Sequence, residues 1–366
     1  MIRSAQSRFP VVSKSHSGMS GKNNEDRFGV TAFLLNKRNP TPVLLAVLSD
    51  GVGGHKAGEV AAGLAVSLIT ETVSESSVVN PVQSIQLGIH RASQAIFAEA
   101  QKDTGKQGMA ATVAVAWMIG HRLYTASVGD SRIYLLRGDK IRQISTDHTW
   151  IQEALDNNVL TPDQVEGHPN RHVIRRYLGG ATPPEVDFRM RLDEAEDDQQ
   201  SVNNQGTILQ AGDRLLLSSD GLTDLVKDDE ILAAFAQNDA ETAVDTLIDL
   251  ANQRGGHDNI TIISFEIPSG INVVADKQPT IPVGFWVTAI IVGLLASLIF
   301  GYFWLQRNAF DWSRFFSATQ ESPQVTLNPV ITSAPQITAT TGRINYPQLV
   351  VTETPRILLP KPSQTP

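Results

Sequence analysis

Short apolar runs typical of β-strands recur along the chain, and their order relative to helical patterns constrains the fold most. Two long segments with helical spacing, 56–73 and 81–102, follow the first such run, 43–48, in succession. Runs 112–119 and 123–128 are instead joined by a short turn, and further runs lie at 215–217 and 260–265. Shorter helical patterns cover 229–235 and 241–253. This order does not alternate regularly as in a Rossmann fold, and it predicts an α+β domain with antiparallel sheets covered by helices.

A long apolar stretch near the C-terminus is the second constraint. No charged residue occurs between Lys277 and Arg307, and the core of this interval, 283–305, is 23 residues long. At about 1.5 Å per residue such a helix spans roughly 35 Å, enough to cross a hydrocarbon layer of about 30 Å. Aromatic residues lie at both ends, where the membrane interfaces would be. A buried core helix is the alternative, but it would usually show a polar stripe, so we predict a single transmembrane helix.

The flanking segments suggest a topology. No apolar run near the start resembles a secretory signal peptide, so we expect residues 1–276 to stay in the cytoplasm. The nearby cations, Lys277 on one side and Arg307 and Arg314 on the other, slightly favour the opposite orientation. We predict a linker over 271–282. The segment 306–366, with eight prolines from Pro323 onward, is expected to form an extended or disordered tail on the far side of the membrane.

The composition limits the chemistry that this chain can perform. Its 366 residues include no cysteine, which excludes disulfides, thiolate zinc sites and cysteine nucleophiles. Any catalysis must therefore use oxygen, nitrogen or a metal ion. Residues 1–276 carry 24 Lys and Arg against 35 Asp and Glu, a net charge of −11, which argues against nucleic acid as a partner.

Acidic residues recur at the ends of the predicted strands. Asp50 and Asp220 each follow an apolar run and a serine, and each precedes a glycine. One such Asp-Gly pair usually marks only a turn, but two with the same surroundings indicate more. Asp130 follows a third apolar run, and Asp258 stands just before a fourth. Strand ends can meet at one edge of a sheet, and the glycine lets the backbone carbonyl turn inward beside the carboxylate. These residues therefore predict a site for a hard cation.

The donor types favour Mn²⁺ or Mg²⁺ over zinc, because these ions prefer oxygen ligands and retain several waters. The sequence contains neither His-Glu-x-x-His nor the spacing of a P-loop, so neither a zinc peptidase nor a P-loop enzyme is supported. The glycines at 51–54 are predicted to form a tight turn into the following helix.

Six motifs occur in the order found in the metal-dependent protein phosphatase (PPM) family, protein phosphatase type 2C. They are Asn-Asn-Glu-Asp at 23–26, Ser-Asp-Gly-Val-Gly-Gly-His at 49–55, Val-Gly-Asp-Ser-Arg at 128–132, Asp-His at 147–148, Ser-Asp-Gly-Leu at 219–222 and Gly-His-Asp-Asn-Ile-Thr at 256–261. The chain resembles the bacterial branch over about residues 8–267. The resemblance implies a phosphatase catalytic domain over 1–270, folded as a four-layer α-β-β-α sandwich with two antiparallel sheets.

The same resemblance implies metal ligands. Asp50 resembles the carboxylate that bridges the two main ions, and Gly51 resembles the carbonyl ligand of one of them. Asp220 and Asp258 resemble ligands that complete the shell of the other ion. Asp130 resembles the acid that, together with Asp220, holds a third and weaker ion. The implied cofactors are two, or three, Mn²⁺ or Mg²⁺ ions.

Residues beside these ligands are implied in the same way. Glu25 and Asp26 resemble acids that orient water near the metal ions, and they are the candidate catalytic residues. Many family members have a phosphate-binding arginine four residues before this glutamate, where this chain has Gly21. Lys22 is therefore the candidate phosphate-binding residue, although lysine lacks the bidentate fork of arginine. Residues 149–177 resemble the flap beside the active site.

The resemblance implies a Ser/Thr phosphoprotein phosphatase in which two ions about 3.5–4 Å apart activate a water for direct attack on phosphorus. The expected partners are phosphorylated proteins, including Ser/Thr kinases and their substrates, and a membrane through one helix. A catalytically silent, membrane-anchored phosphoprotein scaffold is the alternative, and Gly21 is the feature that supports it. A metal-dependent phosphodiesterase is disfavoured by the order of the motifs. Four histidines lie in or near the motifs: His55, His148, His168 and His172. For each of them, a structural role is a simpler interpretation than proton transfer.

Overall fold

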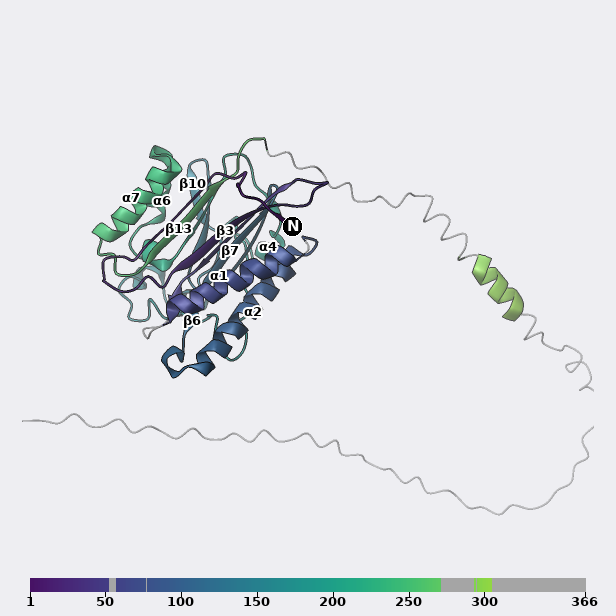
Figure 1. Ribbon diagram of the computed structural model, residues 1–366, viewed down its shortest axis with the longest axis horizontal. Coiled ribbons are helices and arrows are strands. Elements are labelled where there is room, and N and C mark those ends of the chain that lie inside the picture. The colour runs from purple at the N-terminus through teal and green to yellow at the C-terminus, as the bar shows by residue number, and fades with distance from the viewer. Residues whose placement is uncertain (53–56, 77, 271–292, 294, 305–366) are drawn as a thin grey trace, which may run out of the picture. The chain divides into compact units, whose positions relative to one another are not determined.

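The computed structural model describes residues 1–52, 57–76, 78–270, 293 and 295–304 (Figure 1). The chain divides into two compact units, Met1–Pro279 and Thr280–Pro366. The strands of the first unit are β1 (Ile2–Arg3), β2 (Val11–His16), β3 (Arg27–Leu34), β4 (Pro42–Ser49), β5 (Gly51–Val52), β6 (Ala110–Ala111), β7 (Val113–Ile119), β8 (Arg122–Val128), β9 (Arg132–Arg137), β10 (Lys140–Gln143), β11 (Thr207–Ile208), β12 (Arg214–Ser218) and β13 (Ile260–Glu266). Its helices are α1 (Gly58–Glu75), α2 (Pro81–Lys102), α3 (Trp150–Asp156), α4 (Asp198–Asn203), α5 (Asp220–Thr223), α6 (Asp228–Gln237) and α7 (Ala240–Gln253), with 3₁₀ turns η1 (Thr104–Lys106) and η2 (Pro162–Gln164).

Two antiparallel sheets form the centre of this unit. The six-stranded sheet has the order β1-β3-β4-β7-β8-β11, and the five-stranded sheet has the order β10-β9-β12-β13-β2. A short pair of β5 and β6 stands apart from both. Every pairing between these strands is antiparallel.

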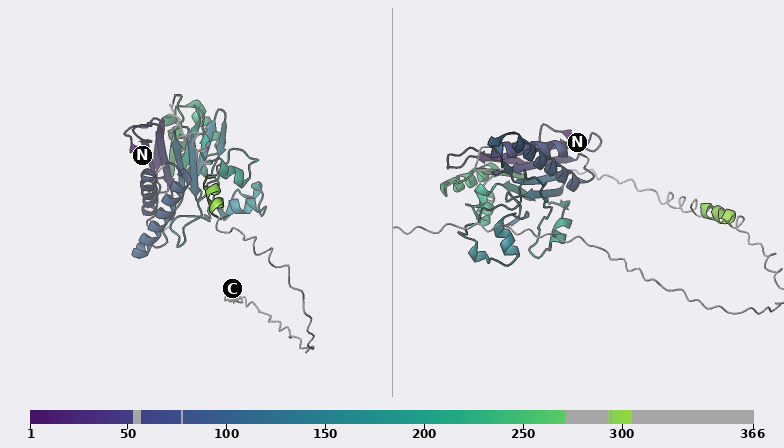
Figure 2. Two further views of the ribbon diagram at one scale, coloured as in Figure 1. Left: turned by 90° about the vertical axis from the view of Figure 1, so that its right-hand side faces the viewer. Right: turned by 90° about the horizontal axis from the view of Figure 1, so that it is seen from below.

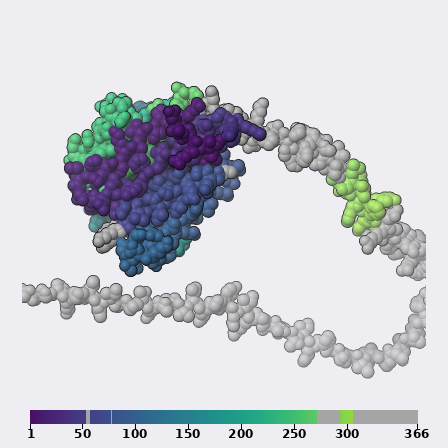
Figure 3. Space-filling view, viewed as in Figure 1, coloured from purple at the N-terminus to yellow at the C-terminus, as the bar shows by residue number. Residues whose placement is uncertain are grey.

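Three apolar cores separate four layers, which confirms the predicted α-β-β-α sandwich. One core joins α1 and α2 to the six-stranded sheet, a second fills the space between the sheets, and a third joins the five-stranded sheet to α6 and α7. Figure 1 shows the two helix pairs on opposite sides of the sheets, and Figure 2 shows the strands with α1 and α2 along one side. The space-filling view in Figure 3 shows the face made by α1 and α2, in blue, beside the N-terminal strands, in purple.

Strand β4 shows why the sequence folds into these layers. All eight of its residues are buried. Because side chains alternate along a strand, Val43, Leu45 and Val47 face the core beneath the helices. Leu44, Ala46 and Leu48 face the core between the sheets. A strand covered on both faces needs the continuous apolar run that the sequence contains.

The predicted elements are confirmed, with small shifts at their ends. Helix α2 covers the predicted range and has Pro81 in its first turn. Strands β2 and β9 were not predicted, because the last four residues of β2 are all polar and β9 begins within the Gly-Asp-Ser-Arg motif, at Arg132. One local prediction was wrong at its start: Gly51 and Val52, expected to begin a tight turn over 51–54, form the strand β5, and residues 53–56 lie outside the described residues. Asp220 is the first residue of the short helix α5.

In the second unit, residues 293 and 295–304 are helical, and large apolar side chains there, such as Leu298, Phe300 and Trp304, are exposed. The rest of the predicted transmembrane segment 283–305, the linker 271–282 and the tail 306–366 lie outside the described residues. Among the helices of the described part of the chain, none combines the length and the apolar character needed to span a membrane.

Candidate active site and metal centre

Most of the predicted site residues line one cavity of about 1060 Å³ in the first unit. Its wall contains Lys22, Glu25, Asp50, Gly51, Asp220 and Asp258. Two predicted residues, Asp26 and Asp130, do not line it. The expectation that carboxylates from separate strand ends meet at one place is therefore confirmed for Asp50, Asp220 and Asp258.

Both sheets contribute to this cavity. Asp50 follows the end of β4, in the six-stranded sheet. Asp220 follows β12, and Asp258 stands two residues before β13; both of these strands lie in the five-stranded sheet. In the six-stranded sheet, Arg27 of β3 pairs with Ser49 of β4, which brings the segment preceding Arg27 beside Asp50. The cavity thus lies where strand ends from the two layers meet.

The two Asp-Gly pairs require glycine for close backbone packing. A Cβ at Gly51 would collide with the backbone of Gly58, at the start of α1. A Cβ at Gly221 would collide with the carbonyl of Asn259, beside Asp258. These glycines therefore let each aspartate approach the element opposite it, which is a packing reason for the repeated pattern.

Asp26 lies behind the cavity wall rather than in it. Its side chain is 3% exposed, and its Oδ2 accepts a hydrogen bond from the Ser219 hydroxyl at 2.7 Å. Burial raises the pKa of Asp26 to about 6, although the hydrogen bond from Ser219 opposes this effect. Asp26 therefore contacts the serine that precedes Asp220, and it reaches the cavity only through its neighbours.

The clustered carboxylates make this region unfavourable for further negative charge. Loss of solvent, followed by the charges of neighbouring aspartates, raises the pKa values of Asp50 and Asp220 well above their usual range. Burial, followed by the charge of Asp147, raises the pKa of Asp130 to about 7. Like charges held in a poorly solvated space are costly unless a cation offsets them. The electrostatics of the cluster therefore favour a bound cation.

The donor atoms fit a divalent hard cation. One carboxylate oxygen each of Asp26, Asp130 and Asp220 is buried and has no hydrogen-bond partner in the described part of the chain. Unpartnered buried acceptors are rare in folded proteins, and carboxylate oxygens are the ligands that Mg²⁺ and Mn²⁺ prefer. The residues present therefore fit the predicted cofactor.

Asp130 lines a second cavity, of about 450 Å³. Asp220 lines both cavities. This placement agrees with the expectation that Asp130 and Asp220 together hold an ion separate from the main pair. That ligand assignment remains a prediction.

Three functional candidates, Arg171, His172 and Asp224, were not assigned to the site from the sequence. His172, Asp220 and Asp224 place one possible ligand atom each within 4.8 Å of one another. Asp224 accepts from Arg171 at 3.4 Å, and its Oδ2 lies 3.1 Å from His172 Nδ1. Arg171, His172 and Asp224 line both cavities. Asp224 comes four residues after Asp220, one helical turn away, and this spacing is the signal that could have identified it.

The segment predicted to form the flap, 149–177, has secondary structure of its own. Residues 149–177 contain α3 and η2, and Thr149 pairs with Ile174 to close the segment at its base. His168 stacks on Trp150 with ring centroids 4.9 Å apart, so its role is structural. His148 is buried with both ring nitrogens bonded. His55 lies outside the described residues.

Comparison with known proteins agrees with this geometry. Residues 14–251 match the family described as protein phosphatase 2C. The serine/threonine protein phosphatase PstP of Mycobacterium tuberculosis is 32% identical over 256 residues, which cover 70% of this chain and 44% of that protein. The match thus spans less than half the length of this relative. The serine/threonine phosphatase stp of Listeria innocua is 30% identical over 260 residues, which cover 69% of this chain and 94% of that protein.

Solved structures share the fold. The crystal structure of the Mycobacterium tuberculosis phosphatase PstP matches with a TM-score of 0.59 and 30% identity, covering 71% of this chain and 99% of that one. The catalytic domain of PstP in complex with two manganese ions matches with a TM-score of 0.57 and 30% identity, covering 70% and 97%. The expected Mn²⁺ or Mg²⁺ cofactor is therefore confirmed for the family. The chain belongs to the protein phosphatase 2C family, and its matching region is a metal-dependent serine/threonine phosphatase domain of the bacterial type.

Proposed function

We propose that the whole protein hydrolyses phosphoserine and phosphothreonine in phosphoproteins. The observation that carries this proposal is the meeting of Asp50, Asp220 and Asp258, from both sheets, in one open cavity. When bound there, Mn²⁺ or Mg²⁺ supplies Lewis-acid chemistry, which lowers the pKa of a water and offsets charge on the phosphoryl group. Because the chain contains no cysteine, no cysteinyl-phosphate intermediate can form. Direct attack by water on phosphorus needs no such intermediate.

The chain's own residues would hold and orient the reactants. Asp50, Gly51, Asp220 and Asp258 are the proposed ligands of the two main ions. Glu25 lines the cavity, and the backbone N–H of Gly58 stabilises its carboxylate, while burial raises its pKa. A partly buried carboxylate held in this way can accept a hydrogen bond from water and so orient it. Asp26 would act indirectly, through the Ser219 hydroxyl beside Asp220.

The test is hydrolysis of a phosphothreonine peptide by the full chain in detergent, with Mn²⁺ and with EDTA. We expect turnover only with the metal. Asp50→Asn and Asp220→Asn should each lower kcat/KM roughly 100-fold or more, because each weakens a metal site that contributes several kcal/mol. Asp245→Asn is the matched control, since Asp245 pairs with Lys14 on the surface.

Failure of a folded, Mn²⁺-loaded chain to hydrolyse the peptide would contradict the proposed activity. If that chain still bound the phosphopeptide, the silent scaffold would replace the enzyme. Hydrolysis of a bis-phosphodiester in preference to the phosphopeptide would instead favour the phosphodiesterase.

Arg171 is a second candidate for binding the substrate phosphate, beside Lys22. Both line the cavity. Within the described part of the chain, the guanidinium of Arg171 makes only two long contacts, both to Asp224, at 3.3 and 3.4 Å, so it has donors to spare. We expect Arg171→Ala to raise KM for the phosphopeptide about 10-fold or more, the effect of losing one charged hydrogen bond of about 1.5–3 kcal/mol. Arg175→Ala is the matched control, because Arg175 pairs with Glu153 on the flap and does not line the cavity. An unchanged KM for Arg171→Ala would leave Lys22 as the phosphate ligand.

We propose further that residues 283–305 anchor the protein in the cell membrane, with residues 1–270 on the cytoplasmic side and 306–366 on the far side. The uncharged stretch with aromatic residues at both ends supports this assignment. Exposed apolar side chains among the helical residues 295–304 are in accord with it. Phosphorylated proteins at the membrane, among them Ser/Thr kinases and their substrates, are the proposed partners.

A further inference from the structure

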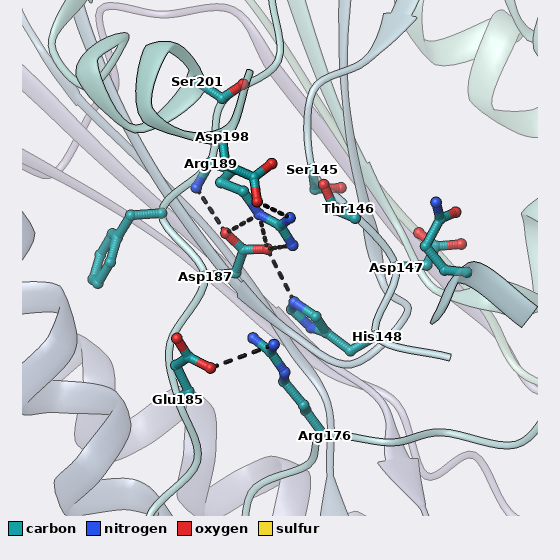
Figure 4. Close-up of polar contacts among 12 residues, drawn as sticks. Ser145, Thr146, Asp147, His148, Arg176, Glu185, Asp187, Arg189, Asp198 and Ser201 are labelled. Atoms are coloured by element: carbon teal, nitrogen blue, oxygen red, sulfur yellow. Dashed lines mark hydrogen bonds and ion pairs between the residues drawn. The ribbon is translucent and has the colours of Figure 1, made fainter. Parts of the chain in front are cut away.

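His148, Asp187 and Arg189 form a hydrogen-bonded network that lines neither cavity (Figure 4). At its centre is His148, which is 4% exposed. Its Nδ1 accepts a hydrogen bond from the Gly129 N–H at 3.0 Å. Its own backbone N–H donates to the Gly129 carbonyl at 2.9 Å. His148 therefore holds the residue before Asp130 with both its main chain and its side chain.

The other ring nitrogen of His148 faces Asp187, with Nε2 and Oδ2 3.0 Å apart. A backbone N–H can only donate, so Nδ1 carries no proton, and Nε2 must carry the ring proton that is donated to Asp187. Burial alone would raise the pKa of Asp187, but hydrogen bonds from His148 and Arg189 hold it well below its usual value. Asp187 is thus a charged acceptor that fixes both the tautomer and the orientation of the ring.

Asp187 is itself held against strand β8 by an isolated bridge. Its backbone exchanges two hydrogen bonds with Ser127, in β8, at 3.0 and 3.1 Å. Its Oδ2 accepts from Arg189 Nη2 at 2.6 Å, and Arg189 also pairs with Asp198 of α4 at 3.1 Å. Figure 4 shows His148 and Arg189 approaching the carboxylate of Asp187. The orientation of His148 is therefore set by a carboxylate whose backbone is hydrogen-bonded to β8.

The turn that carries Asp130 is also held on its other side. The hydroxyls of Ser131 and Thr112 lie 2.7 Å apart, and Thr112 Oγ1 accepts from the Asp50 N–H at 3.1 Å. Gly129 has a φ of +106°, and a Cβ there would lie 2.6 Å from the Thr112 side chain. Gly129 and Ser131 are thus both held in place. Among the described residues of this turn, the Asp130 carboxylate alone has a buried side-chain oxygen without a hydrogen-bond partner.

His148 also contacts the base of the flap. Its carbonyl accepts from the Arg175 N–H at 2.7 Å. The next residue, Thr149, pairs with Ile174. His148 therefore joins the base of the flap to the Asp130 turn.

We propose that His148, oriented by Asp187, is a positioning residue that fixes the Asp130 turn against the flap base and thereby sets the affinity of the third cation. This proposal rests on the proposed metal-dependent function. His148 does not touch substrate, because it lines neither cavity. Its effect acts through Gly129 on the direction in which the Asp130 carboxylate points.

The test counts Mn²⁺ bound by the full chain without substrate, from the EPR signal of free Mn²⁺. In His148→Gln the side-chain donor toward Asp187 can persist, but the acceptor for Gly129 is lost. In His148→Asn the acceptor can persist, but the donor is lost. We expect the third Mn²⁺ to bind roughly 10-fold or more weakly in His148→Gln, as for other residues that orient a metal ligand, and less weakly in His148→Asn. The two tighter ions should bind as in the wild type.

Glu185→Gln is the matched control, because it removes an exposed ion pair with Arg176 on the same segment and should leave all ions unchanged. Unchanged third-ion affinity in folded His148→Gln would overturn the proposal, as would equal weakening of all ions or a wild-type chain that binds only two. If the His148 variants do not fold, Asp187→Asn decides by the same criteria, since it keeps an acceptor for Nε2–H without the charge. Because binding is counted without substrate, loss of the proposed phosphatase activity would not change this outcome.

Discussion

At the scale of single residues, the cost of the acidic cluster is clearest at Asp26. Its pKa is raised to about 6 from an ordinary value of 3.8, so the folded chain binds this proton more tightly than the unfolded chain does. Unfolding therefore releases a proton between about pH 4 and pH 6, and the stability of the metal-free protein falls as pH rises through that window. The unfolding free energy lost across this window is roughly 3 kcal/mol, and the loss is complete above about pH 6.

Urea unfolding in EDTA, compared between pH 4.5 and pH 7.5, measures this effect. Between pH 4.5 and pH 7.5, we expect the urea midpoint of the wild type to fall more than that of Asp26→Asn, because the asparagine side chain does not ionise. Adding Mn²⁺ should raise the urea midpoint of the wild type at pH 7.5, because a cation that binds the folded chain stabilises it by mass action. Parallel pH profiles for the two proteins would show that Asp26 ionises normally.

At the scale of elements, the packing between the two sheets stabilises the strand ends that carry the site. Ile263 of β13 is fully buried in the core between the sheets and pairs with Leu217 of β12. Ile263→Ala should cost about 2–5 kcal/mol of unfolding free energy, since it removes buried methyl groups and leaves a cavity. Ile208→Ala is the matched control, because Ile208 is 60% exposed on β11, and we expect a change within about 0.5 kcal/mol. Urea unfolding at fixed Mn²⁺ measures both, and equal small effects would contradict the assigned core.

At the scale of the whole molecule, the first unit contains both cavities and all three apolar cores. A chain ending at residue 270 should therefore keep the phosphopeptide kcat/KM of the full chain within about twofold, since it retains every described residue that lines the two cavities. In cell fractionation, the full chain should sediment with membranes and the shortened chain should not. A full chain that stays in the supernatant would refute the proposed anchor, and a shortened chain that folds without activity would show that the second unit contributes to the site.

Most of the elements, and most of the residues that line the main cavity, could be predicted from the sequence alone. Periodicity located β4, α2 and β13, because burial on one or two faces imposes a repeat that is visible in the order of residues. Asp50, Asp220 and Asp258 could be identified because each stands next to an apolar run that becomes a strand. β2 was missed because its polar residues hide the repeat.

Which of these residues contact one another, and which line the same cavity, depends on the tertiary structure. Asp26 bonds to Ser219, 193 residues away in sequence, and lies behind the cavity instead of in it. Asp130 proved to line a second cavity, and the flap brought Arg171 and His172 to Asp224. His148 acquired a positioning role only where β8 and the Asp187 segment meet. Such contacts depend on how strands and loops that are far apart along the chain pair in space. A local pattern of residues does not predict that pairing.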